Sequence, residues 1–238
     1  VNVAVQIAEQ IADYLLTGAV TNALNMPSVS AEDAPKLAPY MNLATQMGSL
    51  EGQLTQSGIK AVSIEYEGHA AELNTKPITA AILQGLLSPM LEGVNMVSAP
   101  AIAKERDIDI TEVRHDRPSE YQTLVTLKVT TEKHTRTVKG TLFAGKDARI
   151  VDINGIPMDA KLGKHMLFLT NEDKPGFIGG AGTVLGNAGI NVATFNLGRS
   201  EEGGEALALI EVDQAVDDNV LDELRALPQV VRAQALAF

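Results

Sequence analysis

The strongest constraint on the fold lies in the last 74 residues, 165–238, where short apolar runs alternate with two helical segments. Apolar runs bounded by turn residues predict four strands, at 165–170, 190–197, 206–212 and 230–236. Helices are predicted at 177–188 and 217–227, and the first is followed by Gly189, which suits the left-handed residue beyond a helix end. The order βαββαβ is typical of a split βαβ, or ferredoxin-like, domain.

Residues 1–164 mix helices with strands. Apolar residues spaced by four from Val3 to Leu15 predict one long helix over 1–24, which stops near Pro27. Further helices are predicted at about 30–54, 77–91 and 99–106. Strands are predicted at 61–66, 111–115, 121–131, 135–143 and 149–153. The expected fold class is therefore α+β, with a mixed α/β region followed by a ferredoxin-like domain.

Composition excludes several classes of protein. The chain is 45% hydrophobic and can bury a core, and its net charge of −11 argues against a nucleic-acid-binding protein. Because it has no cysteine, disulfides, thiol nucleophiles, zinc-thiolate sites and cysteine-held iron–sulfur clusters are excluded from this chain. No apolar run approaches the roughly 18–20 residues that a membrane-spanning helix needs.

The charge is unevenly distributed. Residues 1–127 carry 7 basic and 15 acidic side chains, and residues 165–238 carry 4 basic and 11 acidic ones. Between them, residues 128–164 carry 8 basic and 4 acidic side chains, a net charge of +4. This basic stretch is a candidate anion site. The alternative is the solvated face of a β-hairpin.

The segment from Asn171 to Gly176 joins the first predicted strand of the C-terminal domain to its first helix. Free N–H groups at the start of that helix suit a small carboxylate, and Gly176 lets the backbone come close to a ligand. Asp173 could hold an ammonium group, so the pair would suit an amino acid. Asp173 could equally cap its own helix. Asn191 could bridge to a ligand or stabilise a turn.

Other motifs are weaker. The glycines between Gly179 and Gly186 fall inside a helix, and the next strand bears no acid, so they do not form a dinucleotide fingerprint. His69 and Glu72 are one helical turn apart, but a pair without a third ligand is a weak metal motif. The other histidines, among them His115, have no ligand-like neighbours at motif spacing. We therefore predict no metal site.

Three segments resemble those of one enzyme family. Residues 8–27 resemble the closing helix of the catalytic part of long-form D-3-phosphoglycerate dehydrogenases. Residues 140–145, Gly-Thr-Leu-Phe-Ala-Gly, and 149–155, Arg-Ile-Val-Asp-Ile-Asn-Gly, resemble their intervening domain. Asp-Lys-Pro-Gly at 173–176 with Gly-Ile-Asn-Val at 189–192 resembles an ACT domain, an amino-acid-sensing module.

The resemblance implies three parts: the terminal helix of a catalytic part at 1–28, an intervening allosteric substrate-binding domain at 29–160 and an ACT domain at 165–238. Family members oxidise 3-phosphoglycerate with NAD in the first step of L-serine biosynthesis. The resemblance implies that their catalytic and NAD-binding residues lie before Val1. The chain opens without a methionine, which agrees with a piece of a longer protein. This chain alone would then be inactive and bind no cofactor, and it would form cytoplasmic homo-oligomers through its ACT domains.

The family's site residues can be matched to positions here. Asp173, Asn191 and Gly176 match positions that bind L-serine, and Asn171 falls where relatives often have His or Tyr. Basic positions of the intervening domain, a second allosteric site for phosphate or 3-phosphoglycerate in some members, match Arg149, Lys161, Arg136 and Lys139.

Two other hypotheses are open. The chain could be an amino-acid-binding regulatory subunit of another enzyme, such as a bacterial L-serine dehydratase, although such a subunit has no reason to carry the leading helix. It could also be a self-contained enzyme that uses His69 and Glu72.

Overall fold

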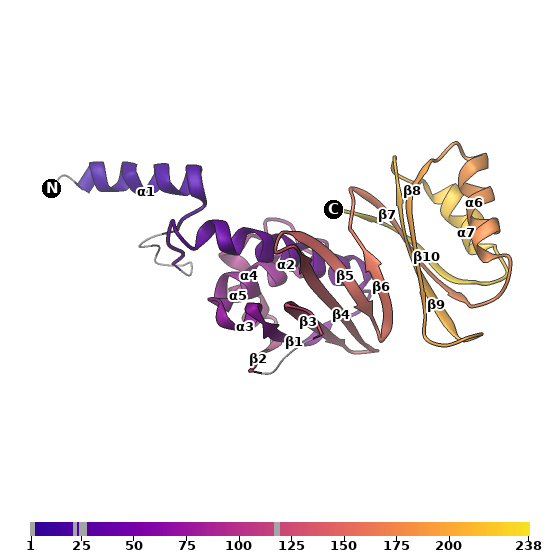
Figure 1. The fold of residues 1–238 in the computed structure, drawn as a ribbon, viewed down its shortest axis with the longest axis horizontal. Helices are drawn as coiled ribbons and strands as arrows, with labels where there is room; N and C mark the ends of the chain where they lie inside the picture. Colours follow the sequence, from indigo (N-terminus) through magenta and orange to yellow (C-terminus); the bar gives the residue numbers. More distant parts are fainter. Residues whose placement is uncertain (1–2, 21–22, 24–27, 117–119) are drawn as a thin grey trace. The chain divides into compact units, whose positions relative to one another are not determined.

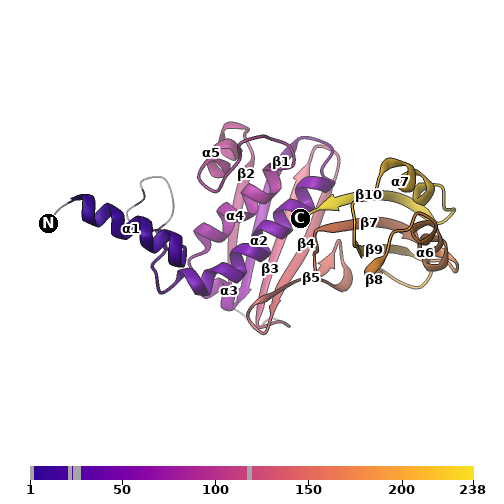
Figure 2. The ribbon, with the colours of Figure 1, turned by 90° about the horizontal axis from the view of Figure 1, so that it is seen from above.

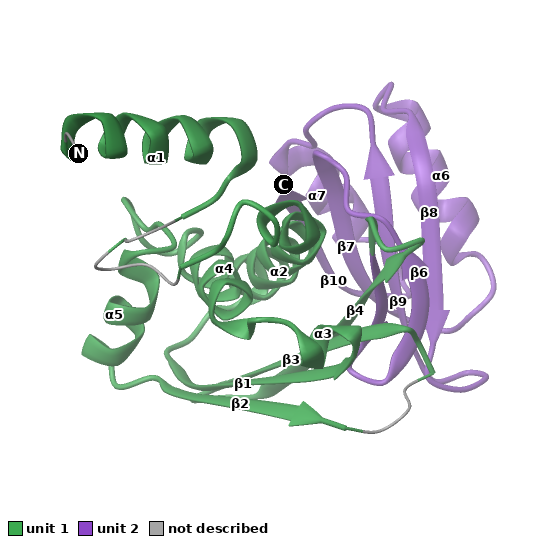
Figure 3. Cartoon of the chain, turned by 60° about the vertical axis from the view of Figure 1, so that its left-hand side comes forward, with its two compact units in different colours: residues 1–148 green, residues 149–238 purple. Residues whose placement is uncertain are grey.

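The computed structural model describes residues 3–20, 23, 28–116 and 120–238, which form two compact units (Figure 3). The first unit comprises residues 1–148 and the second residues 149–238. The boundary between the units falls within a strand, Asp147–Ile153. Among the described helices, none combines the length and hydropathy needed to cross a membrane.

The N-terminal helix α1, Val3–Thr17, is shorter than the predicted helix over 1–24. It ends because Gly18 takes a left-handed conformation with φ +77° while its N–H bonds to the Tyr14 carbonyl. Val20 then forms an isolated β-bridge with Val29. The predicted helical residues 21–22 and 24, and the predicted stop near Pro27, lie outside the described residues. None of the α1 side chains is buried.

The first unit contributes four strands, in the order β2-β1-β3-β4, to a mixed sheet. The strands are β1 Ile59–Gly68, β2 Asp109–His115, β3 Thr123–Thr131 and β4 Thr135–Phe143. Strands β1 and β2 are parallel, so the chain between them must cross over the sheet, and the other pairs are antiparallel. The crossover contains α3 His69–Glu72, α4 Thr75–Leu87 and α5 Ser98–Glu105.

Helices α2, Ala34–Leu54, and α4 pack together over one face of this sheet (Figure 2). Their backbones are almost in contact, because a Cβ on Gly48 would lie 2.2 Å from the Ile82 carbonyl oxygen. A Cβ on Gly85 would meet the Thr45 carbonyl oxygen at 2.3 Å. Apolar side chains from the helices and the sheet form the core, among them Leu43, Met47, Leu50, Ile82, Leu86, Val62, Ile64, Leu127 and Val138.

Strands β5 Asp147–Ile153 and β6 Ile156–Ala160 form a β-hairpin, which from Arg149 onward lies in the second unit. Asn154 and Gly155, which join the two strands, both have positive φ angles, at 54° and 82°. That is the geometry of a tight two-residue hairpin turn, for which Asn-Gly is a favoured sequence. Strand β6 was not among the predicted elements.

The rest of the second unit is a βαββαβ domain, as predicted. Its elements are β7 His165–Glu172, α6 Phe177–Asn187, β8 Val192–Arg199, β9 Glu205–Val212, α7 Asp218–Arg225 and β10 Val230–Ala237. The sheet order is β10-β7-β9-β8 and its pairs are antiparallel. Both helices cover one face (Figure 1), and Leu169, Phe177, Leu185 and Ile210 belong to the core between the layers. The sequence therefore predicted this fold correctly.

Strand β6 packs against β8. The contact is close, because a Cβ on Gly198 would lie 2.4 Å from the Pro157 carbonyl oxygen. Since Phe195 packs in the core beneath the helices, Gly198, three residues further along β8, points to the opposite face. The hairpin therefore covers part of the sheet face that α6 and α7 leave open.

Candidate functional site

A cavity of about 510 Å³ lies where β7 ends and α6 begins. Its walls come from the β7–α6 loop, the first turn of α6, the end of β8 and the β8–β9 loop. The lining residues include Asn171, Asp173, Lys174, Pro175, Gly176, Phe177, Leu197, Arg199 and Gly203. Three of the four residues predicted to bind an amino acid thus line one cavity.

The Asp173 side chain accepts hydrogen bonds from the end of β8 and from the β8–β9 loop. Its Oδ2 accepts a hydrogen bond from Nη1 of Arg199 at 2.8 Å and another from the Gly203 N–H at 3.1 Å. The Arg199 guanidinium and, next, the Gly203 amide lower the pKa of this carboxyl group. Helix α6 has no side-chain cap, so Asp173 does not cap its own helix, which was the alternative interpretation.

The start of α6 is suited to an anion. Gly176 is the N-cap residue, and its φ of +98° is a backbone conformation that favours glycine. The first N–H groups of an α-helix have no partner within the helix and carry partial positive charge, which favours a carboxylate. In this cavity these N–H groups and the Asp173 carboxylate occur together. The N–H groups suit the carboxylate of an amino acid, and Asp173 suits its ammonium group.

Asn171, at the end of β7, lines the same cavity and carries a buried acceptor. It is only 3% exposed, and its Nδ2 donates to the Glu172 carbonyl at 2.9 Å. Its Oδ1 is buried and accepts no hydrogen bond from the residues that the structure describes. A buried acceptor without a donor is costly, so a ligand hydroxyl or ammonium group would satisfy it.

Asn191 is not among the residues that line this cavity. Its Nδ2 donates to Oδ2 of Asp213 at 2.8 Å, and both side chains are exposed. Asn191 directly precedes β8 whereas Arg199 is its last residue, so roughly 25 Å of extended strand separates them. Within one chain, Asn191 and Asp173 therefore cannot contact the same small ligand.

The predicted basic residues are divided between the units. In the second unit, Arg149 directly precedes Ile150 and Lys161 directly follows Ala160, and Ile150 and Ala160 are paired in the hairpin. Arg149 also makes an ion pair with Asp159 at 3.4 Å.

In the first unit, Arg136 is buried, and its Nε donates to Oε2 of Glu51 at 2.9 Å. This contact gives Arg136 a structural role. Lys139 lies in register with Thr126, which faces Glu65 on the next strand.

One group of possible metal ligands was missed by motif spacing. His69 and Glu72 both lie in α3, and no third ligand joins them among the described residues. Glu65, Glu67 and His115 do form a group, with ligand atoms within 4.8 Å of one another. His115 is distant from the two glutamates in the sequence, and only the parallel pairing of β1 with β2 brings them together.

The fold defines a class of protein: an α+β protein with a mixed α/β domain before a ferredoxin-like domain. The family of D-3-phosphoglycerate dehydrogenase intervening domains matches residues 36–154, and the ACT domain family matches residues 165–229. The chain belongs to the D-3-phosphoglycerate dehydrogenase intervening-domain family and carries an ACT domain after it.

Curated relatives agree with this assignment. The D-3-phosphoglycerate dehydrogenase of Bacillus subtilis (strain 168) is 35% identical over 236 residues, which are 99% of this chain and 45% of the relative. The Methanocaldococcus jannaschii enzyme of the same name is 32% identical over 94% of this chain and 43% of its own length. D-3-phosphoglycerate dehydrogenase 3, chloroplastic, of Arabidopsis thaliana is 27% identical over 96% of this chain. The chain thus spans less than half the length of these relatives.

Proposed function

We propose that this chain is the regulatory half of an NAD-dependent D-3-phosphoglycerate dehydrogenase and that its ACT domain binds L-serine as an effector. The oxidation of 3-phosphoglycerate with NAD would then be carried out by residues of the parent enzyme outside this chain. The observation that carries the proposal is the cavity in which Asp173 faces the uncapped start of α6.

Each polar group of serine finds a partner of matching chemistry in this cavity. The ammonium group would bind Oδ1 of Asp173, because Oδ2 already accepts from Arg199 and Gly203. The carboxylate would bind the N–H groups of the first α6 turn. The serine hydroxyl would donate to the buried Oδ1 of Asn171. An amino acid without a side-chain donor would leave that oxygen unsatisfied, which favours serine.

Asn191 would enter the site from a second copy of the chain. Strand β8 is the outer strand of the four-stranded sheet, so its edge can pair with another strand. If two β8 strands pair antiparallel about a two-fold axis, the start of one lies near the end of the other. Asn191 of the partner subunit would then approach Arg199 and Asp173, and each pair of ACT domains would hold two shared sites.

Calorimetric titration of L-serine into the 238-residue chain tests this proposal, with D-serine as the control ligand. Asp173→Asn removes the charge that would hold the ammonium group and should abolish the heat of binding. Asp222→Asn is the matched control, because Asp222 is an exposed aspartate of α7 outside the cavity. Absence of heat at millimolar L-serine, or binding by Asp173→Asn within a few-fold of the unsubstituted chain, would sink the proposal.

Mixing two binding-deficient variants tests whether the site is shared. Asp173→Asn and Asn191→Ala should each lose binding when purified alone. After mixing and exchange of subunits, half of the dimers contain both variants, and each of these has one intact site of two. About a quarter of the L-serine sites present in the unsubstituted protein should therefore bind again. If mixing restores nothing, although both variants dimerise, Asp173 and Asn191 do not act on one ligand.

The regulatory subunit of another enzyme, such as L-serine dehydratase, is the competing function. The match of residues 36–154 to the D-3-phosphoglycerate dehydrogenase intervening domain supports the dehydrogenase instead. We also propose that phosphate or 3-phosphoglycerate binds at Arg149 and Lys161, which flank the paired residues Ile150 and Ala160 of the β5–β6 hairpin. Arg136 takes no part in this second proposal because it is buried against Glu51.

A further inference from the structure

The group formed by Glu65, Glu67 and His115 lies on the sheet of the first unit, apart from the serine cavity. We propose that these three side chains bind one divalent transition-metal ion such as Zn²⁺, and that the ion fastens the end of β2 to β1. The inference is independent of the proposed binding of L-serine.

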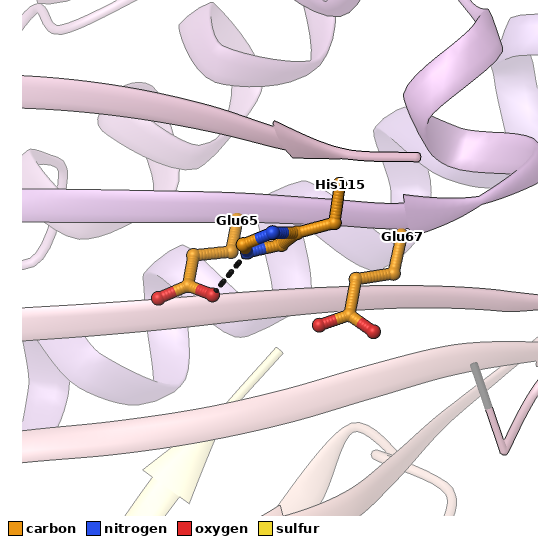
Figure 4. A group of neighbouring side chains, drawn as sticks. All are labelled: Glu65, Glu67 and His115. Atoms are coloured by element: carbon orange, nitrogen blue, oxygen red, sulfur yellow. Dashed lines mark hydrogen bonds and ion pairs between the residues drawn. The ribbon is translucent and has the colours of Figure 1, made fainter. Parts of the chain in front are cut away.

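The backbone puts the three side chains together. Glu65 and Glu67 are two residues apart on β1, so their side chains leave the same face of the sheet. His115 is the last residue of β2, and the parallel register sets it directly beside Glu67. Figure 4 shows the imidazole ring and both carboxylates directed toward the same side of the strands. This arrangement is fixed by two paired strands rather than by a loop.

The atoms are close to the geometry of a metal site. Nε2 of His115 lies 2.8 Å from Oε2 of Glu65, and one ligand atom from each residue lies within 4.8 Å of the others. Zn²⁺ binds imidazole nitrogen and carboxylate oxygen at about 2.0–2.2 Å, so tetrahedral ligands are roughly 3.3–3.5 Å apart. Side-chain rotations that move the ligand atoms by about 1 Å would allow all three residues to coordinate one ion.

The ligand types and their burial agree with a transition metal. One imidazole with two carboxylates is a ligand set for Zn²⁺ and its neighbours, whereas Mg²⁺ and Ca²⁺ favour oxygen alone. Glu67 is only 8% exposed, and a divalent ion would neutralise its carboxylate together with that of Glu65. The side chains of His115 and Glu65 are 25% and 37% exposed, which leaves room for a water at a fourth position.

One lysine provides a competing positive charge. Thr126 of β3 faces Glu65, and Lys139 of β4 faces Thr126, so Lys139 lies on the same sheet face two strands away. Removal of its charge by Lys139→Met should strengthen Zn²⁺ binding several-fold at low salt, because a repelling cation is lost. Weaker binding by this variant would show that the carboxylates do not hold the ion, and would count against the proposal.

Titration of the 238-residue chain with Zn²⁺ tests the site, followed by calorimetry and by the visible absorption of Co²⁺ substituted for it. We expect one ion per chain. His115→Gln and Glu67→Gln should each weaken binding at least tenfold and abolish the Co²⁺ spectrum. His69→Gln is the matched control, since it removes another histidine of the same unit that lies beside an acidic residue, and it should change neither measurement.

A second readout separates lost ligation from lost folding. Zn²⁺ should slow hydrogen exchange at the β2 amides in the unsubstituted chain but not in His115→Gln, while both exchange alike without metal. No binding at tenfold molar excess, or unchanged affinity in both His115→Gln and Glu67→Gln, would overturn the proposal. Loss of binding in His69→Gln alone would overturn it as well, because the ion would then lie at α3.

Discussion

Arg199, the last residue of β8, forms an ion pair with Asp173 of the β7–α6 loop, with 2.8 Å between Nη1 and Oδ2. The pair joins two sides of the cavity at the start of α6. It occupies one oxygen of Asp173 and fixes the orientation of the carboxylate, so that Oδ1 can receive an ammonium group. Both partners are partly exposed, so the pair contributes to the placement of the carboxylate more than to the stability of the fold.

The first prediction concerns how L-serine binding depends on pH. Arg199 lowers the pKa of Asp173, so the carboxylate remains charged, and able to bind an ammonium group, at pH values below its ordinary titration range. Arg199→Gln removes this effect and raises the pKa. As the solution is acidified, binding by Arg199→Gln should therefore be lost at a higher pH than binding by the unsubstituted chain. Calorimetric titrations between pH 3 and 7 measure both curves, and coincident curves would contradict the prediction.

The second prediction concerns the buried ion pair between Glu51 of α2 and Arg136 of β4. Arg136→Met should lower the free energy of unfolding of the first unit by about 3–5 kcal/mol, because it leaves a carboxylate buried without its partner. Glu51→Gln combined with Arg136→Met should recover much of that loss. Urea unfolding followed by circular dichroism measures the changes.

A surface pair supplies the control for that measurement. Lys60 and Glu132 lie 3.2 Å apart, and both side chains are mostly exposed. Lys60→Met should change the unfolding free energy by only about 0–1 kcal/mol. If the two single variants have equal effects, burial does not determine the contribution of the Glu51–Arg136 pair.

The third prediction concerns anion binding at the β5–β6 hairpin. Arg149→Ala together with Lys161→Ala should weaken the binding of phosphate and 3-phosphoglycerate, because it removes two positive charges that flank the Ile150–Ala160 pair. Lys164→Ala, which removes an exposed lysine of the same basic stretch, is the control. Equilibrium dialysis at low salt measures the affinities. An unchanged affinity in the double variant would show that these basic side chains belong to a solvent-exposed face that does not bind the anion.

The fold of the C-terminal domain could be predicted because each element carries its own local signal. Strand 165–170, for example, is an apolar run that a Pro-Gly turn follows, and the structure has β7 over His165–Glu172. The first helix was predicted too long because the apolar pattern continues beyond Gly18, whose left-handed backbone ends the helix. Strand β6 was missed although the Asn154-Gly155 turn before it is a recognisable hairpin signal.

The candidate sites show the limit of local patterns more clearly. Asn171, Asp173 and Gly176 lie within six residues, so the chain itself brings them together. Arg199 was missed because it reaches Asp173 only through the β7–β9–β8 strand order. His115 was judged to lack ligand-like neighbours for the same reason, since its neighbours come from β1. Arg136 was predicted at an anion site, but its burial against α2 is a tertiary contact that charge patterning does not reveal.

The fourth prediction tests the close contact between β6 and β8. A Cβ at position 198 would lie 2.4 Å from the Pro157 carbonyl oxygen and 2.7 Å from Cγ2 of Ile156. Gly198→Ala should therefore destabilise the second unit by about 1–3 kcal/mol, because the backbone of β6 must move away. Gly182→Ala is the matched control. It lies inside α6, where an added Cβ meets nothing within 4 Å, and it should stabilise the unit by roughly 0.5–1 kcal/mol.

Thermal unfolding of both glycine variants, with and without L-serine, measures this contact and its connection to the effector site. Gly198 directly precedes Arg199, which holds Asp173. Displacement of the hairpin should therefore also disturb the carboxylate, and Gly198→Ala should bind L-serine more weakly than Gly182→Ala does. If Gly198→Ala is destabilised but binds L-serine normally, the hairpin contact and the effector site are independent. If it is as stable as the unsubstituted chain, β6 is not closely packed on β8.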